Sequence, residues 1–305
     1  MTRRTMHLPT TVLALGAGLL LAAAPAQADS LETPVARAAN LASAAGWQAW
    51  SAAQPDGTYR LQLRRPDGTV LTPAIRAFGA PVDPAIGTRG FGADGTPASR
   101  RLSAVYARCV GRSALAGCDV YALDLTKLTE AKVTALASRA YSETAPSLTF
   151  GNWSFVRRGS SAGQGTYAYI ERNGRVRRLS PIVALETATA QSRMVFTHRS
   201  GRGFGVQIRQ SSGDGRPLIA AAGLPKAPVS PQLTRYRAGW LMPGDDATRV
   251  FLTRRFAGSG GPFTLKVVEA RTLPAGVRSA AGDASKLFDR YLDAAGVQRI
   301  EPGIR

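Results

Sequence analysis

The chain has 305 residues, with 39 lysines and arginines, 20 acidic residues, two cysteines, two histidines and a net charge of +19. So few histidines and cysteines exclude a zinc site built from several of these ligands. After the first thirty residues, no segment of the sequence is apolar enough to span a bilayer.

The N-terminal segment predicts a cleaved signal peptide. Arg3 and Arg4 form a charged start, residues 11–24 are an uncharged apolar run, and residues 26–28 read AQA, a small-x-small cleavage signal. The run is too short for an easy membrane span and no basic cluster follows it. We therefore expect residues 1–28 to be removed and the chain to be secreted or to stay at the cell envelope. Sec and twin-arginine export both stay open.

The positive charge persists after this cleavage. Loss of Arg3 and Arg4 leaves 37 basic and 20 acidic residues, a net charge of +17, and only five of the basic residues are lysines. The arginines are scattered through strand-like segments, and export argues against nucleic acid as a partner. We expect an anionic envelope polymer or another exported protein as the partner of a monomer, with arginine-rich composition alone as the alternative.

Short alternating runs separated by turn signals indicate an all-β protein. In TYRLQLRR the apolar Tyr59, Leu61 and Leu63 alternate with polar residues, which is typical of a half-buried antiparallel strand. PDG, RNG and SGDG mark turns between such runs. The same plan recurs along the chain in LSAVYARC and CDVYALDL, NWSFVRR and TYAYIER, RMVFTHR and FGVQIRQ, and AGWLMPG and TRVFLTRR.

These runs repeat at a regular spacing. Corresponding anchors lie 56, 49, 41 and 45 residues apart, at Trp50, Tyr106, Phe155, Phe196 and Leu241. Periods in the forties with about four strands per unit predict a β-propeller of five to six four-stranded antiparallel blades. Stretches before the anchors, such as ETAPSLTFG and SPQLTRYRA, supply the fourth strands. Completion of a sixth blade by both termini stays open.

The C-terminal segment predicts a helix. We place the propeller at residues 29–275 and a tail at 276–305, in which Asp283 caps a helix and Gly296 ends it. The apolar stripe of this helix consists of Leu287, Phe288, Tyr291 and Leu292. The helix is expected to pack on the side or base of the propeller, with a partner-binding arm as the alternative.

Two motifs give the chain a family resemblance. GWQAWSAAQPDGTYRLQLRRPDGTVLTP and VDPAIGTRGFGADG…SAVYARC…GCDVYALDL resemble blades of exported TolB-like, WD-type (PD40-like) propellers of actinobacteria. The likeness covers residues 45–209 and fades after Trp240. It implies an extracellular propeller without known catalysis and with no defined ligand. The segment GTRGFGADG has fewer acidic residues than the family's usual pattern, which weakens any expectation of a cation there.

No catalytic motif stands out, so we expect no cofactor and no metal. His198 is the only histidine left after cleavage, and a hydrogen-bonded histidine at a strand end is favoured over a catalytic base. Asp83, Glu143 and Glu186 could face a central funnel, where paired carboxylates would suit a glycosidase. Asp119 and Asp124 are expected to be structural acids of turns and strand ends.

The densest basic cluster is a candidate site for anions. If equivalent turns of two neighbouring blades share a face, six arginines form one patch for phosphate-rich or acidic ligands. They are Arg172, Arg175, Arg177, Arg178, Arg199 and Arg202. Solvent-facing arginines of a basic protein are the alternative interpretation.

The two cysteines predict a disulfide. Cys109 ends one expected strand and Cys118 begins the next, so a hairpin brings them opposite each other. An oxidising compartment favours this single possible pairing.

Taken together, the sequence favours an exported, non-enzymatic binding or scaffold propeller. A carbohydrate-active enzyme on the same fold is the alternative, and the side chains of the central channel are the feature that discriminates between them.

Overall fold

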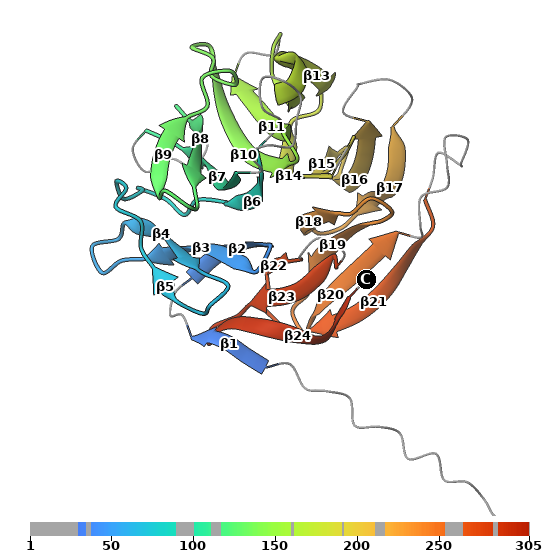
Figure 1. Cartoon of the computed structure of the whole chain (residues 1–305). Coiled ribbons are helices and arrows are strands. Elements are labelled where there is room, and N and C mark those ends of the chain that lie inside the picture. The colour runs from blue at the N-terminus through green and yellow to red at the C-terminus, as the bar shows by residue number, and fades with distance from the viewer. Residues whose placement is uncertain are drawn as a thin grey trace, which may run out of the picture.

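The computed structural model describes residues 30–34, 38–89, 101–110, 117–159, 162–190, 192–210, 217–253, 265–282 and 286–304. Their strands form six four-stranded antiparallel sheets arranged as the blades of a propeller (Figure 1). In this part of the chain the only helical element is a 3-10 turn, Glu171–Asn173. No helix in it is long and apolar enough to cross a membrane.

The first three blades follow the chain in order. Blade 1 consists of β2 (Ala38–Ala44), β3 (Trp47–Ala53), β4 (Tyr59–Arg64) and β5 (Val70–Leu71). Blade 2 consists of β6 (Ala85–Thr88), β7 (Leu102–Arg108), β8 (Asp119–Asp124) and β9 (Thr129–Lys132). Blade 3 consists of β10 (Tyr141–Thr149), β11 (Asn152–Gly159), β12 (Gly165–Ile170) and β13 (Arg175–Ser180).

The other three blades complete the ring. Blade 4 consists of β14 (Ala184–Ala190), β15 (Arg193–Ser200), β16 (Gly203–Gln210) and β17 (Leu218–Leu224). Blade 5 consists of β18 (Val229–Leu233), β19 (Ala238–Pro243), β20 (Thr248–Thr253) and β21 (Val267–Leu273). Blade 6 consists of β22 (Ser279–Ala281), β23 (Phe288–Leu292), β24 (Gly296–Ile304) and the N-terminal β1 (Ser30–Pro34).

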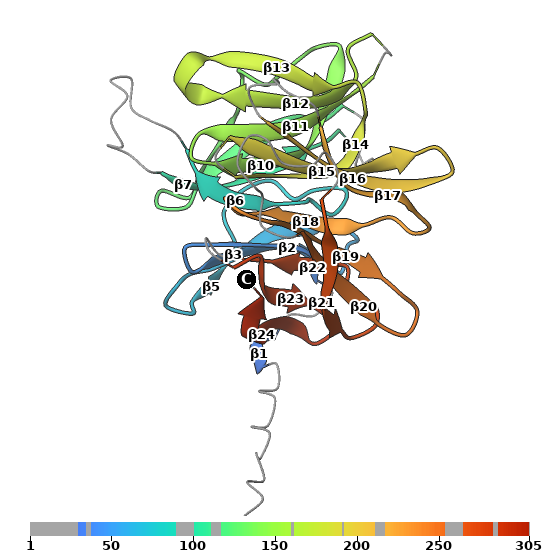
Figure 2. The same cartoon turned by 90° about the vertical axis from the view of Figure 1, so that its right-hand side faces the viewer.

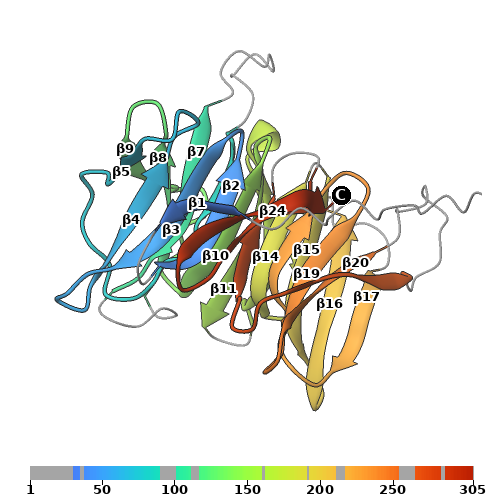
Figure 3. The same ribbon diagram turned by 90° about the horizontal axis from the view of Figure 1, so that it is seen from below.

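Both termini therefore build one blade. The antiparallel pair of β1 and β24 sets Ser30 opposite Arg299 and Pro34 opposite Gly296. Figures 2 and 3 show β1 beside β24. A blade shared by both termini closes the ring, which answers the question that the sequence left open.

The predicted C-terminal helix is wrong. Residues 288–292 form the strand β23. Arg290 at its centre is half-buried, and the two residues on each side of Arg290 are buried. A strand in the middle of a blade packs against neighbouring blades on both faces, so apolar residues follow one another in pairs, as they do on a helix stripe. The expected cap, Asp283, lies outside the described residues.

The repeat inferred from the sequence is confirmed strand by strand. The five anchors Trp50, Tyr106, Phe155, Phe196 and Leu241 lie on the second strands of blades 1 to 5, and all five are fully buried. The side chains of Tyr106, Phe155, Phe196 and Leu241 belong to large apolar clusters between neighbouring blades. Between blades 6 and 1 the described residues form a cluster of Leu41, Ala281, Leu292 and Val297.

The first strands of the blades surround the axis and come close together. A Cβ added to Gly87 on β6 would collide with the backbone carbonyl of Leu148 on β10. Leu148 belongs to the cluster between blades 2 and 3. Glycine at this position therefore lets two neighbouring first strands approach each other.

Candidate functional site

A cavity lies on the propeller axis between the first strands. It has a volume of about 430 Å³ and is lined by residues from all six blades. Most of the lining side chains are small or carry hydroxyls, for example Ala42, Ser147, Thr187, Ala188 and Ser279. Side chains of this size leave room for a ligand while the strand edges and hydroxyls offer hydrogen bonds.

We name the two ends of this axis by the turns that surround them. The mouth face carries the turns between first and second strands, such as 149–152 and 234–238, and the base face is the opposite one. Phe150, Ala190, Thr234 and Arg235 line the axial cavity, so it reaches the mouth face. A second cavity of about 260 Å³, lined by Asn40, Phe78 and Arg158, lies toward the base face.

Two carboxylates stand where the two cavities meet. Asp83 and Glu186 line both of them. Asp83 directly precedes β6, and the Val82 backbone beside it is held by hydrogen bonds to the side chains of Asn40 and Ser51 in blade 1. The Asp83 side chain is exposed to the axial space although protein surrounds that space.

Glu186 reaches the axis through an irregularity in its strand. The register of β14 against β15 shifts between Ala184 and Glu186. The Oε2 atom of Glu186 accepts a hydrogen bond of 2.6 Å from the backbone N–H of Ser230 in blade 5. Ser230 has a φ of +47° and lies at a register shift of β18, so this bulge turns its amide toward the neighbouring blade.

The surroundings make both carboxyl groups weaker acids. Burial raises the pKa of Glu186, and repulsion by the Asp83 carboxylate raises it further, while the Ser230 amide acts in the opposite direction. Burial alone raises the pKa of Asp83. Neither pKa is lowered by an arginine or a lysine. The pair is therefore uncompensated and resists carrying two charges.

The mouth of the axial cavity has the opposite charge. Arg235 and Lys286 are the cationic side chains among the described residues that line this cavity. Nearby, Phe150 and Tyr236 are 45% and 49% exposed, and the Arg235 guanidinium lies 5.3 Å from the Tyr236 ring centre. An aromatic and cationic rim of this kind suits an anionic ligand.

Charge is thus separated along the axis. Glu186 bonds to the backbone of Ser230, and Arg235 follows five residues later, past the end of the same strand. At about 3.3 Å per residue the chain between Ser230 and Arg235 spans at most roughly 16 Å.

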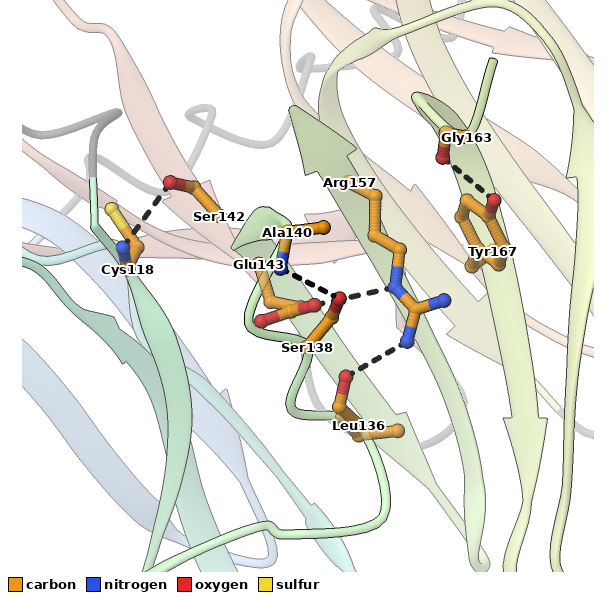
Figure 4. A network of polar contacts seen from close by, with 9 residues as sticks. All are labelled: Cys118, Leu136, Ser138, Ala140, Ser142, Glu143, Arg157, Gly163 and Tyr167. Atoms are coloured by element: carbon orange, nitrogen blue, oxygen red, sulfur yellow. Dashed lines mark hydrogen bonds and ion pairs between the residues drawn. The ribbon is translucent and has the colours of Figure 1, made fainter. Parts of the chain in front are cut away.

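Glu143, the third candidate acid, does not reach the axis. It is fully buried between blades 2 and 3, where its Oε1 accepts a hydrogen bond of 3.2 Å from Arg157 (Figure 4). Arg157 also donates to the carbonyl of Leu136. Burial raises the pKa of Glu143 to about 7 although the Arg157 charge lowers it. Its surroundings are those of a structural ion pair.

The six arginines of the candidate patch are divided between the two faces. Arg172 and Arg175 flank the turn from β12 to β13 on the mouth face, where the neighbouring Glu171 amide donates to the carbonyl of Gly151. Arg199 and Arg202 flank the turn from β15 to β16 on the base face. The two turns are not equivalent, because one follows the third strand of its blade and the other follows the second.

The remaining two arginines, Arg177 and Arg178, lie on β13, the outermost strand of blade 3. Arg178 donates to the carbonyl of Ala162, on the base side of the same blade. All six arginines are exposed. The structure brings Arg172 and Arg175 together at the mouth face and separates them from Arg199 and Arg202.

The other polar candidates have structural surroundings. His198 is buried in β15, and its Nδ1 lies 2.7 Å from the Arg199 carbonyl. Asp119 forms an ion pair of 2.7 Å with Lys132, and Asp124 accepts hydrogen bonds from the turn that follows it. No group of three or more histidine, cysteine or acidic side chains within the described ranges could hold a metal ion.

The predicted disulfide is confirmed. Cys109 and Cys118 are bonded across the hairpin of β7 and β8. The Cys118 amide lies within 3.3 Å of the Ser142 hydroxyl, and its carbonyl accepts from the Glu143 amide, so this hairpin also contacts blade 3 (Figure 4). The neighbouring Tyr106 and Arg108 both donate to the Glu130 carboxylate at 2.6 Å.

Sequence reasoning missed four residues of this site. Arg158, Ser230, Arg235 and Lys286 line the two cavities, yet they lie in segments with no distinctive motif. The one available signal was repetition of xP directly before or within first strands, in DPA, APS and SPQ, which marks Asp83, Ala145 and Ser230 as equivalent positions at the axis.

Comparison with solved structures agrees with the fold. TolB from Acinetobacter baumannii is 17% identical with a TM-score of 0.50, over 78% of this chain and 54% of that one. A lectin from Aleuria aurantia, solved in complex with Fucα1-6GlcNAc, is 10% identical with a TM-score of 0.52, over 87% of this chain and 93% of that one. This chain thus spans about half the length of TolB. These likenesses define the class of protein as a β-propeller.

The family to which the chain belongs is not defined by these likenesses. No family model matches the chain, and no curated protein matches it.

Proposed function

We propose that this chain is an exported binding propeller that takes an anionic polymer of the cell envelope into its axial cavity from the mouth face. The observation that carries the proposal is the cavity itself, lined by all six blades and flanked at its mouth by Arg235 and Lys286. Arg172 and Arg175 extend the positive charge over the same face. The resemblance of the sequence to exported TolB-like, WD-type propellers of actinobacteria supports the same proposal.

Export is part of this proposal. Cleavage after Ala28 leaves Asp29 as the first residue, and β1 begins at Ser30. The proposed mature chain therefore keeps every described strand, including the one that closes blade 6. N-terminal sequencing of the protein recovered from the culture medium should begin at Asp29.

The binding proposal is tested with the mature chain on a series of acidic and neutral oligosaccharides, each measured at low and at high salt. Acidic members should bind, and their binding should weaken as salt increases, because the rim attracts them electrostatically. Binding of neutral members alone, or binding of acidic members that does not change with salt, would contradict the proposal.

A glycoside hydrolase is the second candidate, favoured by one observation. Asp83 and Glu186 line the same cavity and their pKa values are both raised, as is required of a carboxylic acid that donates a proton at neutral pH. In this candidate Glu186, whose pKa is raised by two causes, is the proton donor and Asp83 is the ionised partner. Release of reducing sugar that stops in both Asp83→Asn and Glu186→Gln would establish it.

A further inference from the structure

In the described part of the chain, no arginine or lysine lowers the pKa of Asp83 or Glu186, the acidic pair on the axis. Among the described residues that line the two cavities, the cationic side chains are Arg158, Arg235 and Lys286. Arg158 donates to the Ala184 carbonyl at 2.8 Å and to the Thr144 hydroxyl at 3.2 Å. Arg235 and Lys286 lie at the distant mouth. Asp83 and Glu186 therefore lie in one enclosed cavity region, and no cationic side chain among the described residues neutralises their charge there.

Ionising both side chains of this pair costs the folded protein free energy. The proximity of Asp83 disfavours ionisation of Glu186, and only the Ser230 amide compensates it. A cation that enters the cavity restores both carboxylates to their charged form and gains charge-assisted hydrogen bonds with them. The site is thus arranged to favour a cationic group that arrives with a ligand.

An ammonium group fits this space better than a metal ion does. Among the described residues no group of three or more histidine, cysteine or acidic side chains could hold a metal ion, so a calcium ion would have to take most of its six to eight oxygen ligands from outside this pair. An ammonium group has three N–H donors and forms strong hydrogen bonds with two carboxylates and one further acceptor. Ser147, Thr187 and Ser279 add hydroxyl groups to the lining of the same cavity.

We infer that Asp83 and Glu186 bind an ammonium group of the ligand, so that the ligand is an acid which also carries a primary amine. The inference rests on the proposed function, because the same ligand must place its acidic group at Arg235 and Lys286. The chain from Ser230 to Arg235 spans at most roughly 16 Å when fully extended, so the two charged groups of the ligand should lie no more than about this far apart. A ligand with only acidic groups would meet repulsion at the end of the cavity.

The test uses a matched pair of probes and the mature chain. The linear dimer of 6-aminohexanoic acid carries an ammonium group at one end and a carboxylate at the other, and its N-acetyl derivative lacks only the ammonium charge. Isothermal titration at pH 7 should show that the free amine binds at least about tenfold more tightly. Because the whole protein is strongly positive, general electrostatics would favour the acetylated probe instead.

Three variants locate the effect. Asp83→Asn and Glu186→Gln should each lose the preference for the amine, whereas Asp245→Asn should keep it. Asp245 is a matched control because its side chain is 98% exposed and it pairs with Lys226 away from the axis. Thermal melts report folding, and the two cavity variants should be at least as stable as the wild type, since each removes a repulsive charge.

The outcomes separate this inference from the proposed function. Equal binding of both probes, failure of the amine to bind, or a preference that survives in Asp83→Asn and Glu186→Gln would overturn the ammonium site. If acidic oligosaccharides still bind in a salt-dependent way, the proposed function stands while the inference fails. If they do not, the proposed function fails by its own test.

Discussion

The carboxylate of Glu186 in blade 4 accepts a hydrogen bond of 2.6 Å from the backbone amide of Ser230 in blade 5. This contact joins two register shifts on neighbouring first strands and holds an acidic side chain at the propeller axis. It also gives the Ser230 amide, which the bulge removes from the regular ladder, a partner. The site and the packing of the blades thus depend on the same residue.

Replacement of Glu186 should separate these two roles. Glu186→Gln keeps an acceptor for the Ser230 amide and removes the repulsion with Asp83, so its melting temperature at pH 8 should equal or exceed that of the wild type. Glu186→Ala leaves the amide without that acceptor and should cost about 1–3 kcal/mol of unfolding free energy. Urea unfolding of the two variants at pH 8 measures the difference. Equal stabilities would show that the hydrogen bond does not matter.

Stability should fall as pH rises from 5 to 8. The pKa of Glu143 is raised to about 7, and those of Asp83 and Glu186 are also raised, each chiefly by burial. The folded state therefore holds protons that the unfolded state has released, so unfolding becomes easier as pH passes from the ordinary carboxyl range through these raised values.

The melting temperature of the wild type, measured in steps from pH 5 to pH 8, checks this dependence. The Asp83→Asn/Glu186→Gln double variant should show a shallower decline over the same range, with Glu143 responsible for what remains. An identical decline in both proteins would contradict the assignment of raised pKa values to the axial pair.

The disulfide should make a measurable contribution to stability. Cys109 and Cys118 close a short hairpin loop, with a sequence separation of 9. The chain-entropy model gives about 2–3 kcal/mol for a loop of this length. The Cys109→Ser/Cys118→Ser variant should lose this amount in urea unfolding, and a reducing agent should lower the stability of the wild type but leave that of the variant unchanged.

Glycine should be required at position 87. Gly87→Ala directs a methyl group at the Leu148 carbonyl on the neighbouring first strand and should cost about 1–3 kcal/mol or more. Gly57→Ala is the control, because Gly57 has a φ of +78° and nothing lies within 4 Å of its added Cβ. It should cost about 1–2 kcal/mol through backbone strain alone. A Gly87→Ala variant as stable as the wild type would show that the blades can move apart.

Much of the fold could be predicted from strand periodicity. The second strands can be recognised in the sequence because they are buried on both faces and carry the large anchor residues, such as Trp50 and Phe196. Blade 6 could not be predicted in this way, because β1 lies far from β24 in the sequence. In addition, Leu287–Leu292 has paired apolar residues that also suit the apolar stripe of a helix. A contact between the two termini leaves no local pattern.

The site was predictable only in part. Asp83 and Glu186 were identified as candidates because they precede or begin first strands, but Glu143 has the same sequence context and lies between blades instead. Each of these two strands has a register shift of one residue, but Glu143 lies before the shift in β10 and Glu186 lies directly after the shift in β14, and such a shift changes whether a side chain faces the axis or the adjacent blade. The arginine patch failed as one surface for a similar reason, since alternate turns of a blade lie on opposite faces.

Filling the axial cavity tests the central claim most directly. Ala188 lines this cavity on β14, whereas Ala131 is exposed on β9, so Ala188→Trp and Ala131→Trp introduce the same side chain inside and outside the site. With acidic oligosaccharide as the ligand, the dissociation constant should rise at least about tenfold in Ala188→Trp, equivalent to about 1.4 kcal/mol, and stay unchanged in Ala131→Trp. Wild-type affinity in a folded Ala188→Trp protein would contradict binding in the axial cavity.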